Sequence, residues 1–252
     1  MYQKERLALL MNFISKKKII DVKELEKQMF VSRSTLRRDL IALEKENKII
    51  RNFGQVELNV DTNVEFGYNV RRNDHSYEKK IIAATASNFI GQNQSIFIDS
   101  SSTCNALHSY LKDKRLVVVT NGLNLAQLLV EEPSIETFIC GGHIKTMSGS
   151  ILGQSAEKYL ENFHADILFL SCSGIDETGI YMASEEQSFI KRKMIELSDQ
   201  VILLCDSSKI EKKSYFRMCN YDVIDVLITD KKIRKEFFEI LEKQHVELLI
   251  AE

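Results

Sequence analysis

Six short apolar runs, each followed by a polar or glycine-containing loop, are the feature of this 252-residue sequence that most constrains its fold. Segments with helical spacing lie between them, at residues 76–90, 104–112, 122–131 and 184–198. Continuous apolar strands that alternate with helices are typical of a mainly parallel sheet covered on both faces. We therefore expect an α/β domain whose strands are SIFID, LVVVT, ETFIC, DILFL, VILLC and DVLIT.

The loops that end these runs are candidates for a binding pocket, because ligands of parallel sheets bind outside the carboxyl ends of the strands. The first loop, DSSSTCNAL at 99–107, brings hydroxyl groups to the start of a helix, where free backbone N–H groups attract phosphate. The same serines would also serve as an ordinary N-cap. The convergence of several such loops favours a pocket. The others are TNG at 120–122, CGGH at 140–143, SGIDETG at 173–179 and CDSSK at 205–209.

Charge is distributed unevenly along the chain. Residues 1–60 hold 13 Lys and Arg against 8 Asp and Glu, a net +5, so the remainder carries −7 of the total of −2. A basic end on an acidic body suits a polyanionic partner such as nucleic acid, although +5 also suits an ordinary solvated surface.

The basic end has the pattern of a helix-turn-helix. Residues 2–16 place apolar side chains at helical spacing, and Asp21 can cap a second helix over 22–30. Ser32 can cap a third helix that runs to about residue 46. The segment NKIIRNFGQVEL then predicts two short strands around NFGQ, a wing, with Asn47 as the left-handed cap that ends the helix.

The third predicted helix carries the candidate DNA contacts. Leu36, Leu40 and Leu43 form its buried stripe, which leaves the arginines on the outer face. They would be a solvated surface, with Asp39 neutralising a neighbour, if the helix stood alone. As the second helix of the pair it would enter the major groove, where guanidinium groups read guanine or clamp phosphate. The predicted DNA contacts are Arg33, Ser34, Thr35, Arg37, Arg38, Arg51 and Asn52.

The five cysteines lie in the acidic part, several of them at the ends of apolar runs. We expect buried, reduced thiols and a cytoplasmic protein. Because no pair has C-x-x-C spacing and the five histidines are scattered, we expect no metal site and no cofactor. No apolar run approaches the length needed to cross a membrane. The expected domains are residues 1–58 and 76–252, with a linker over 59–75.

The basic end resembles the helix-turn-helix of the DeoR family of transcription regulators. The family's helix-turn-helix signature has a VSxxTIRRDL segment as its core. The positions of this chain that match the signature are Arg6, Leu10, Ile14, Ser32, Thr35, Leu36, Arg37, Arg38, Asp39 and Leu40. The chain departs from the family in the wing, where Phe53 replaces a His and Gln55 a Gly, and at Asn47, where the family has Gly.

The resemblance extends to the strand-end loops. The family's C-terminal domain is similar to ribose-5-phosphate isomerase and glucosamine-6-phosphate deaminase, and it senses phosphorylated sugars or related metabolites. Its D-x-G-T-T, TN, GG, GID and D-x-S-K motifs have counterparts here, with Ser101 in place of the family glycine. The implied effector contacts are Asp99, Ser101, Ser102, Thr103, Thr120, Asn121, Gly141, Gly142, Asp176 and Lys209. Glu185 is added as a charged side chain of the type that a sugar-binding pocket uses.

Two other functions compete with a ligand-controlled transcription regulator. An enzyme could use Asp176, Glu185, Glu186 and Lys209 around a bound sugar to abstract a proton next to a carbonyl. A DNA-packaging protein would need only the basic end. A fused DNA-reading domain favours the regulator. The resemblance implies a repressor of a sugar or polyol catabolic operon, relieved by a phosphorylated sugar effector. We expect it to bind double-stranded operator DNA as a homo-oligomer, a dimer or tetramer assembled through the C-terminal domain.

Overall fold

A computed structural model describes residues 3–17, 19–45, 48–58 and 67–252. The chain divides into two compact units, of which the second begins at Gly67. Residues 67–75, which we predicted as part of a linker, therefore belong to the second unit. The predicted helix cap at Asn47 lies outside the described residues.

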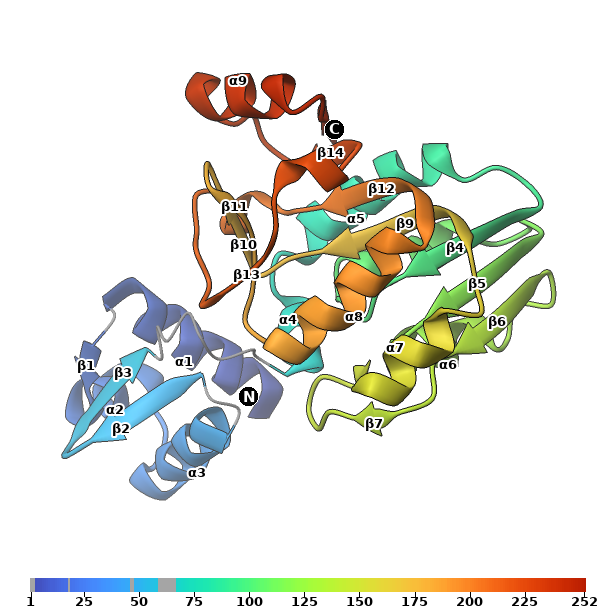
Figure 1. The fold of residues 1–252 in the computed structure, drawn as a ribbon. Helices are drawn as coiled ribbons and strands as arrows, with labels where there is room; N and C mark the ends of the chain where they lie inside the picture. The colour runs from blue at the N-terminus through green and yellow to red at the C-terminus, as the bar shows by residue number, and fades with distance from the viewer. Residues whose placement is uncertain (1–2, 18, 46–47, 59–66) are drawn as a thin grey trace. The chain divides into compact units, whose positions relative to one another are not determined.

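The first unit has the predicted winged helix-turn-helix fold (Figure 1). Its antiparallel sheet has the strand order β1-β3-β2, so the wing β2-β3 gains a third strand that we did not predict. The elements are α1 (Gln3–Lys17), β1 (Ile19–Asp21), α2 (Val22–Met29), α3 (Arg33–Lys45), β2 (Ile49–Asn52) and β3 (Gln55–Leu58).

Local hydrogen bonds set the turn between α2 and α3. The Asp21 side chain accepts the backbone N–H of Lys23 at 2.8 Å and so caps α2. Phe30 ends α2 in the left-handed conformation, with φ 50°. Ser32 Oγ then accepts the backbone N–H of Thr35 at 3.2 Å, as an N-cap residue does. The helix starts therefore follow from capping residues visible in the sequence.

Asp39 has a structural position that the sequence did not indicate. It is buried with Leu36, Leu40 and Leu43 on the inner side of α3. Its carboxylate oxygens accept from Arg6 of α1, at 2.7 Å from Nε and 3.1 Å from Nη2. The reading of Asp39 as a surface charge is therefore wrong, because i and i+3 positions of a helix share one face. The pair joins the first helix to the third.

The second unit is built on a seven-stranded sheet in the order β15-β14-β12-β9-β4-β5-β6, with every neighbouring pair parallel. This confirms the predicted parallel α/β sheet. The strands are β4 (Gln94–Ile98), β5 (Leu116–Thr120), β6 (Ile135–Ile139), β9 (Ala165–Ser171), β12 (Ser198–Leu204), β14 (Val226–Thr229) and β15 (Glu247–Ile250).

Helices cover both faces of the sheet (Figure 1). Alternate strand residues enter two separate apolar cores: Leu168 packs in the core with α7, α8 and α9, and Phe169 in the core with α5, η2 and α6. The predicted helix at 104–112 is instead a 3₁₀ segment, η2. The helices are α5 (Ser76–Ala86), η1 (Ser87–Phe89), η2 (Cys104–Tyr110), α6 (Leu123–Leu129), α7 (Gln154–Leu160), α8 (Glu185–Glu196) and α9 (Lys235–Lys243).

Smaller elements surround the carboxyl ends of the strands. A short helix, α4, precedes α5, and two small antiparallel sheets have the orders β7-β8 and β10-β11-β13. None of the described helices is long and apolar enough to cross a membrane. The bounds are α4 (Tyr68–Asn73), β7 (His143–Ile144), β8 (Ile151–Leu152), β10 (Gly174–Asp176), β11 (Gly179–Met182), η3 (Ser207–Lys209), β13 (Phe216–Cys219) and η4 (Tyr221–Val223).

Candidate DNA-binding and effector sites

A groove in the first unit runs between α3 and the wing. Its α3 side is lined by the exposed residues Arg33, Ser34 and Arg37, and its other side by residues 51–55 of the wing. Five of the seven predicted DNA contacts, these three with Arg51 and Asn52, therefore line one groove. A helix of this kind fits the major groove, and guanidinium groups on it can donate to base edges and to phosphates.

The other two predicted DNA contacts, Thr35 and Arg38, do not line that groove. Thr35 is half-buried, and its Oγ1 is hydrogen-bonded to Ser32 Oγ at 2.9 Å. Arg38 is exposed but does not line the groove. Arg51 lines the groove but also forms an ion pair with Glu44, 3.1 Å from Nε to the carboxylate. Arg33 and Arg37 are consequently the strongest candidates for base or phosphate contacts.

The wing tip replaces the family's histidine with an exposed aromatic ring. Phe53 is fully exposed, and the following Gly54 has φ +84°, which a glycine adopts without strain.

In the second unit, Asp99 organises the loop after β4 from within the protein. It is fully buried, and its Oδ2 lies 2.6 Å from Nζ of the equally buried Lys191 of α8. Its carboxylate also accepts the backbone N–H groups of Ser101 and Ser171, each at 2.8 Å. Burial alone would raise the pKa of Asp99, but Lys191 and these donors hold it below its ordinary value. Asp99, predicted as an effector contact, therefore acts as an internal anchor of that loop.

The predicted residues after β5 also bind other loops. Thr120 and Asn121 are buried, and Thr120 Oγ1 accepts the backbone N–H of Gly122 at 3.0 Å. Asn121 accepts the backbone N–H of Ser100 at 3.1 Å and donates to the carbonyl of Ile151 at 3.2 Å. These side chains fix the loops after β4 and β5 against residues 150–152.

The glycine pair after β6 has two different environments. A Cβ on Gly142 would lie 2.8 Å from the carbonyl oxygen of Leu152, so the backbone there requires glycine. Gly141 is exposed and has no such neighbour.

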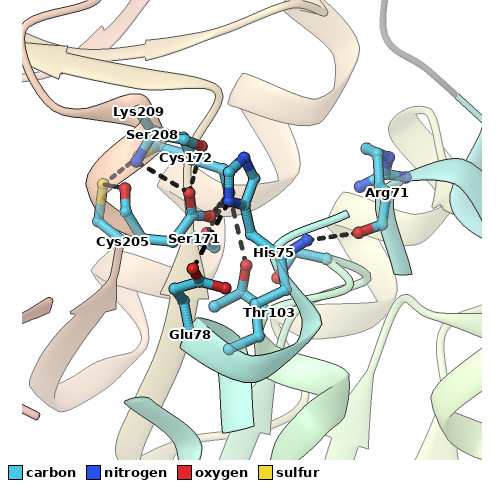
Figure 2. Close-up of polar contacts among 12 residues, drawn as sticks. Arg71, His75, Glu78, Thr103, Ser171, Cys172, Cys205, Ser208 and Lys209 are labelled. Carbon is cyan, nitrogen blue, oxygen red and sulfur yellow. Dashed lines mark hydrogen bonds and ion pairs between the residues drawn. The ribbon is translucent and has the colours of Figure 1, made fainter. Parts of the chain in front are cut away.

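Lys209 is the centre of a polar cluster at the ends of β9 and β12 (Figure 2). Its ammonium lies 3.4 Å from Oγ1 of Thr103, 3.3 Å from Oγ of Ser171 and 3.4 Å from the carboxylate of Asp206. Burial would lower the pKa of Lys209, but Asp206, together with Cys172 and Cys205, raises it. Lys79 completes what we call the Lys209 cluster: Lys209, Asp206, Thr103, Ser171 and Lys79.

The neighbouring loop residues Ser101 and Ser102 have unequal roles. Ser101 Oγ accepts the backbone N–H of Cys104, the first residue of η2, at 3.0 Å. Ser102 is largely buried beside Thr103, on the loop that contacts Lys209. The predicted serine N-cap is not found, because Thr103 occupies the N-cap position without a side-chain cap hydrogen bond. Thr103 is the residue of this loop that contacts the Lys209 ammonium.

Lys79 of α5 and His75, which lies between α4 and α5, act on the same carboxylate, and sequence reasoning missed both. Burial would raise the pKa of Asp206, but Lys209, Ser208, Lys79 and His75 together lower it. Lys79 is buried, and it donates to the carbonyl oxygens of Arg71 and of Asp74. Its own pKa falls to about 8, because of burial first and the Lys209 ammonium second. An anion placed here would relieve the repulsion between the two lysines.

Asp176 and Glu185 lie on other elements. Asp176, on β10, accepts from the backbone N–H and hydroxyl of Thr178 and pairs with Lys213 at 3.3 Å. Burial would raise the pKa of Asp176, but its hydrogen bonds and Lys213 lower it. Glu185 is exposed at the start of α8. A carboxylate with a depressed pKa is a poor general base near neutral pH, which disfavours the proton-abstraction scheme.

The described residues include no group of three or more His, Cys, Asp or Glu side chains that could hold a metal ion. All five cysteines are free thiols. Four of them are buried and Cys219 is half-buried.

The first unit is a winged helix-turn-helix with arginines in an open groove, and the second is an α/β unit with a cationic cluster at its strand ends. Together they define a DNA-binding transcription regulator with a second, ligand-sensing domain. The chain belongs to the DeoR family. Residues 6–62 match the DeoR-like helix-turn-helix domain, and residues 74–231 match the DeoR C-terminal sensor domain.

Curated relatives match along nearly their whole length. The chain is 34% identical to the HTH-type transcriptional repressor GlcR of Bacillus subtilis, covering 100% of this chain and 98% of the relative. It is 30% identical to a putative aga operon transcriptional repressor of Escherichia coli O157:H7 (92% and 88%). It is 28% identical to the glycerol-3-phosphate regulon repressor of Escherichia coli K12 (98% and 99%).

Among solved structures, the chain is similar to ribose 5-phosphate isomerase A from Methanocaldococcus jannaschii. The TM-score is 0.41 at 13% identity, over 54% of this chain and 55% of the isomerase. This similarity is too distant to bear on function.

We predict that Lys191→Ala destabilises the second unit by about 3–5 kcal/mol, because it leaves the Asp99 carboxylate buried without its partner. Chemical denaturation followed by circular dichroism measures the change. Lys193→Ala, on the same helix, is the matched control, since the ion pairs of Lys193 involve exposed glutamates. Equal stability of the two variants would contradict the anchoring role of Lys191.

We predict that Arg37→Ala weakens binding to operator DNA by about 1–3 kcal/mol without unfolding the protein, because Arg37 is exposed in the α3 groove. Fluorescence anisotropy at several salt concentrations separates a lost base contact from a lost phosphate contact. Only the loss of a phosphate contact lowers the salt dependence of the affinity, by about one in slope. Lys45→Ala, which removes an exposed charge at the far end of α3, is the control. Parental affinity and salt slope for Arg37→Ala would exclude this face.

Proposed function

We propose that the protein represses a sugar or polyol catabolic operon and that a phosphorylated sugar relieves the repression. The observation that carries the proposal is the Lys209 cluster, where two lysines and two hydroxyl groups converge at the carboxyl ends of parallel strands. Cations and hydroxyl donors at this end of a parallel sheet suit a phosphate group. Relatives named as repressors of GlcR type and of the glycerol-3-phosphate regulon support the same class of effector.

The phosphate is proposed to bind beside Lys209 and Lys79, with the hydroxyl of Thr103 as a further donor. Ser102 and the loop held by Asn121 would contact the rest of the effector. The predicted contacts Asp176, Glu185 and Gly141 remain candidates for the sugar end. The role assigned to these residues is binding and not turnover, since the acidic candidates are exposed or paired with cations.

Relief of repression requires that the effector bind the DNA-free conformation better than the DNA-bound one, since equal affinity for both would shift nothing. A coupling of about 1–3 kcal/mol, or 5- to 150-fold in operator affinity, is the usual range. One relative is named an L-fucose operon activator. Whether this protein represses or activates its operon is therefore tested directly. Deletion of the gene would raise operon expression if the protein represses and lower it if the protein activates.

We also propose that the protein binds operator DNA as a homo-oligomer, at least a dimer, in the cytoplasm. A single recognition helix reads only a few base pairs, and a symmetric pair of helices reads two half-sites. Light scattering with operator present would contradict the proposal if it found a monomer.

A thermal-shift screen of phosphorylated sugars tests the effector class. An effector at 100 times its Kd adds about 2.7 kcal/mol of stability. The panel is ribose 5-phosphate, glucose 6-phosphate, fructose 6-phosphate and glycerol 3-phosphate, with the unphosphorylated sugars and glycerol as controls. Equal shifts with and without the phosphate group would exclude a phosphate-binding cluster.

We predict that Lys209→Ala keeps operator binding and loses the response to the active compound of that panel, because it removes the central cation of the Lys209 cluster. Lys212→Ala, an exposed lysine three residues further on, is the charge-matched control and should respond like the parent. Thr103→Val removes a hydroxyl and no charge, so it tests the cluster without leaving Asp206 unpaired. Parental responses of both cluster variants would place the effector elsewhere.

A further inference from the structure

Two cysteines meet beneath the Lys209 cluster. Cys172 directly follows β9 and Cys205 directly follows β12, and these neighbouring parallel strands are in register up to the pair Ser171 and Leu204. The register places the two thiols side by side, with the sulfur atoms 3.7 Å apart and hydrogen-bonded. Figure 2 shows both next to Lys209.

The chemical environment separates Cys172 from the other cysteines. The hydrogen bond with Cys205 lowers the pKa of Cys172 in spite of burial, and the Lys209 ammonium lowers it further. Burial raises the pKa of Cys140 and of Cys219 to about 12. Thiolates and not thiols react with oxidants, so Cys172 is the cysteine of this chain best placed to react first.

We propose that Cys172 and Cys205 are an oxidant-sensitive dithiol that closes to a reversible intrachain disulfide at the floor of the effector site. The oxidant is a small peroxide. The Cys172 thiol releases its proton, and the thiolate attacks one peroxide oxygen, so that an S–O bond forms and the O–O bond breaks. The leaving hydroxide takes up the released proton and becomes water. The Cys205 sulfur then attacks the sulfenic sulfur, and the second hydroxide leaves with the Cys205 proton as water. Two sulfur atoms are oxidised and one peroxide is reduced to two waters.

The disulfide would change the geometry around Lys209. A disulfide bond is about 2.05 Å long, so the sulfur atoms must approach from 3.7 Å, which reorients the two cysteine side chains beside the Lys209 contacts. Ser171 precedes Cys172 and Asp206 follows Cys205, and both residues contact Lys209. Oxidation would therefore weaken effector binding, a consequence that rests on the function proposed above.

The disulfide itself is tested on the full chain treated with hydrogen peroxide. We expect the free thiols, titrated after denaturation, to fall from five to three per chain. Mass spectrometry of non-reduced peptides should find Cys172 linked to Cys205, and a dithiol reductant should reverse the link. Cys172→Ser and Cys205→Ser should lose it, whereas Cys140→Ser, at the end of β6, should keep it. Peroxide treatment that leaves both residues unlinked, or links them between chains, would overturn the proposal.

The consequence for binding is tested with the same phosphorylated compounds. The oxidised protein should bind the active compound about fivefold more weakly or worse, with recovery on reduction. The Cys172→Ser, Cys205→Ser double variant should bind equally well before and after peroxide. Unchanged affinity of the linked protein would overturn the connection to the effector site. If the proposed function is wrong, the reduced protein binds none of the compounds. The mass spectrometry of the peptides then tests the disulfide by itself.

Discussion

The ion pair between Lys191 and Asp99 holds together the part of the second unit on which the candidate effector site depends. Lys191 comes from α8, and it donates to Asp99 after β4 and to the carbonyl of Ser171 at the end of β9. Neither charge is exposed, so neither can exchange its partner for water. The loop that carries Ser102 and Thr103 and the strand end that carries Ser171 therefore keep a fixed relation to each other.

The Lys209 cluster is built upon that fixed edge. Thr103 and Ser171, positioned by the buried pair, are the hydroxyl groups nearest to Lys209. Lys79 of α5 adds a second cation, and its side chain donates to the carbonyl oxygens of Arg71 in α4 and of Asp74. α4 begins one residue after Gly67, the start of the second unit, and Tyr68 of α4 accepts a hydrogen bond from Asn105 of η2. The first helix of the sensor unit is thus attached to η2, which directly follows the loop that we propose binds the effector.

Repeating patterns in the sequence predicted the fold well, whereas partners distant along the chain were not predictable. The inner face of α3 was predictable from the helical spacing of Leu36, Leu40 and Leu43. Its start was predictable from Ser32, because helical spacing and capping are local properties of the sequence. The contact of Lys191 with Asp99 spans 92 positions and depends on how α8 packs on the sheet. Lys79 was missed for the same reason, and Asp39 because a buried aspartate is recognised only when Arg6 lies against it. Glu185 was assigned to the pocket from its type alone.

The central claim is that operator DNA and a phosphorylated effector bind one protein with opposing preferences. Calorimetric titration of the active compound, into the free protein and into the protein saturated with operator DNA, tests it most directly. Because coupling between two binding sites is reciprocal, operator DNA must weaken effector binding by the same factor by which the effector weakens operator binding. The account predicts equal factors, each about 5- to 150-fold. Identical effector affinity with and without operator DNA would contradict it.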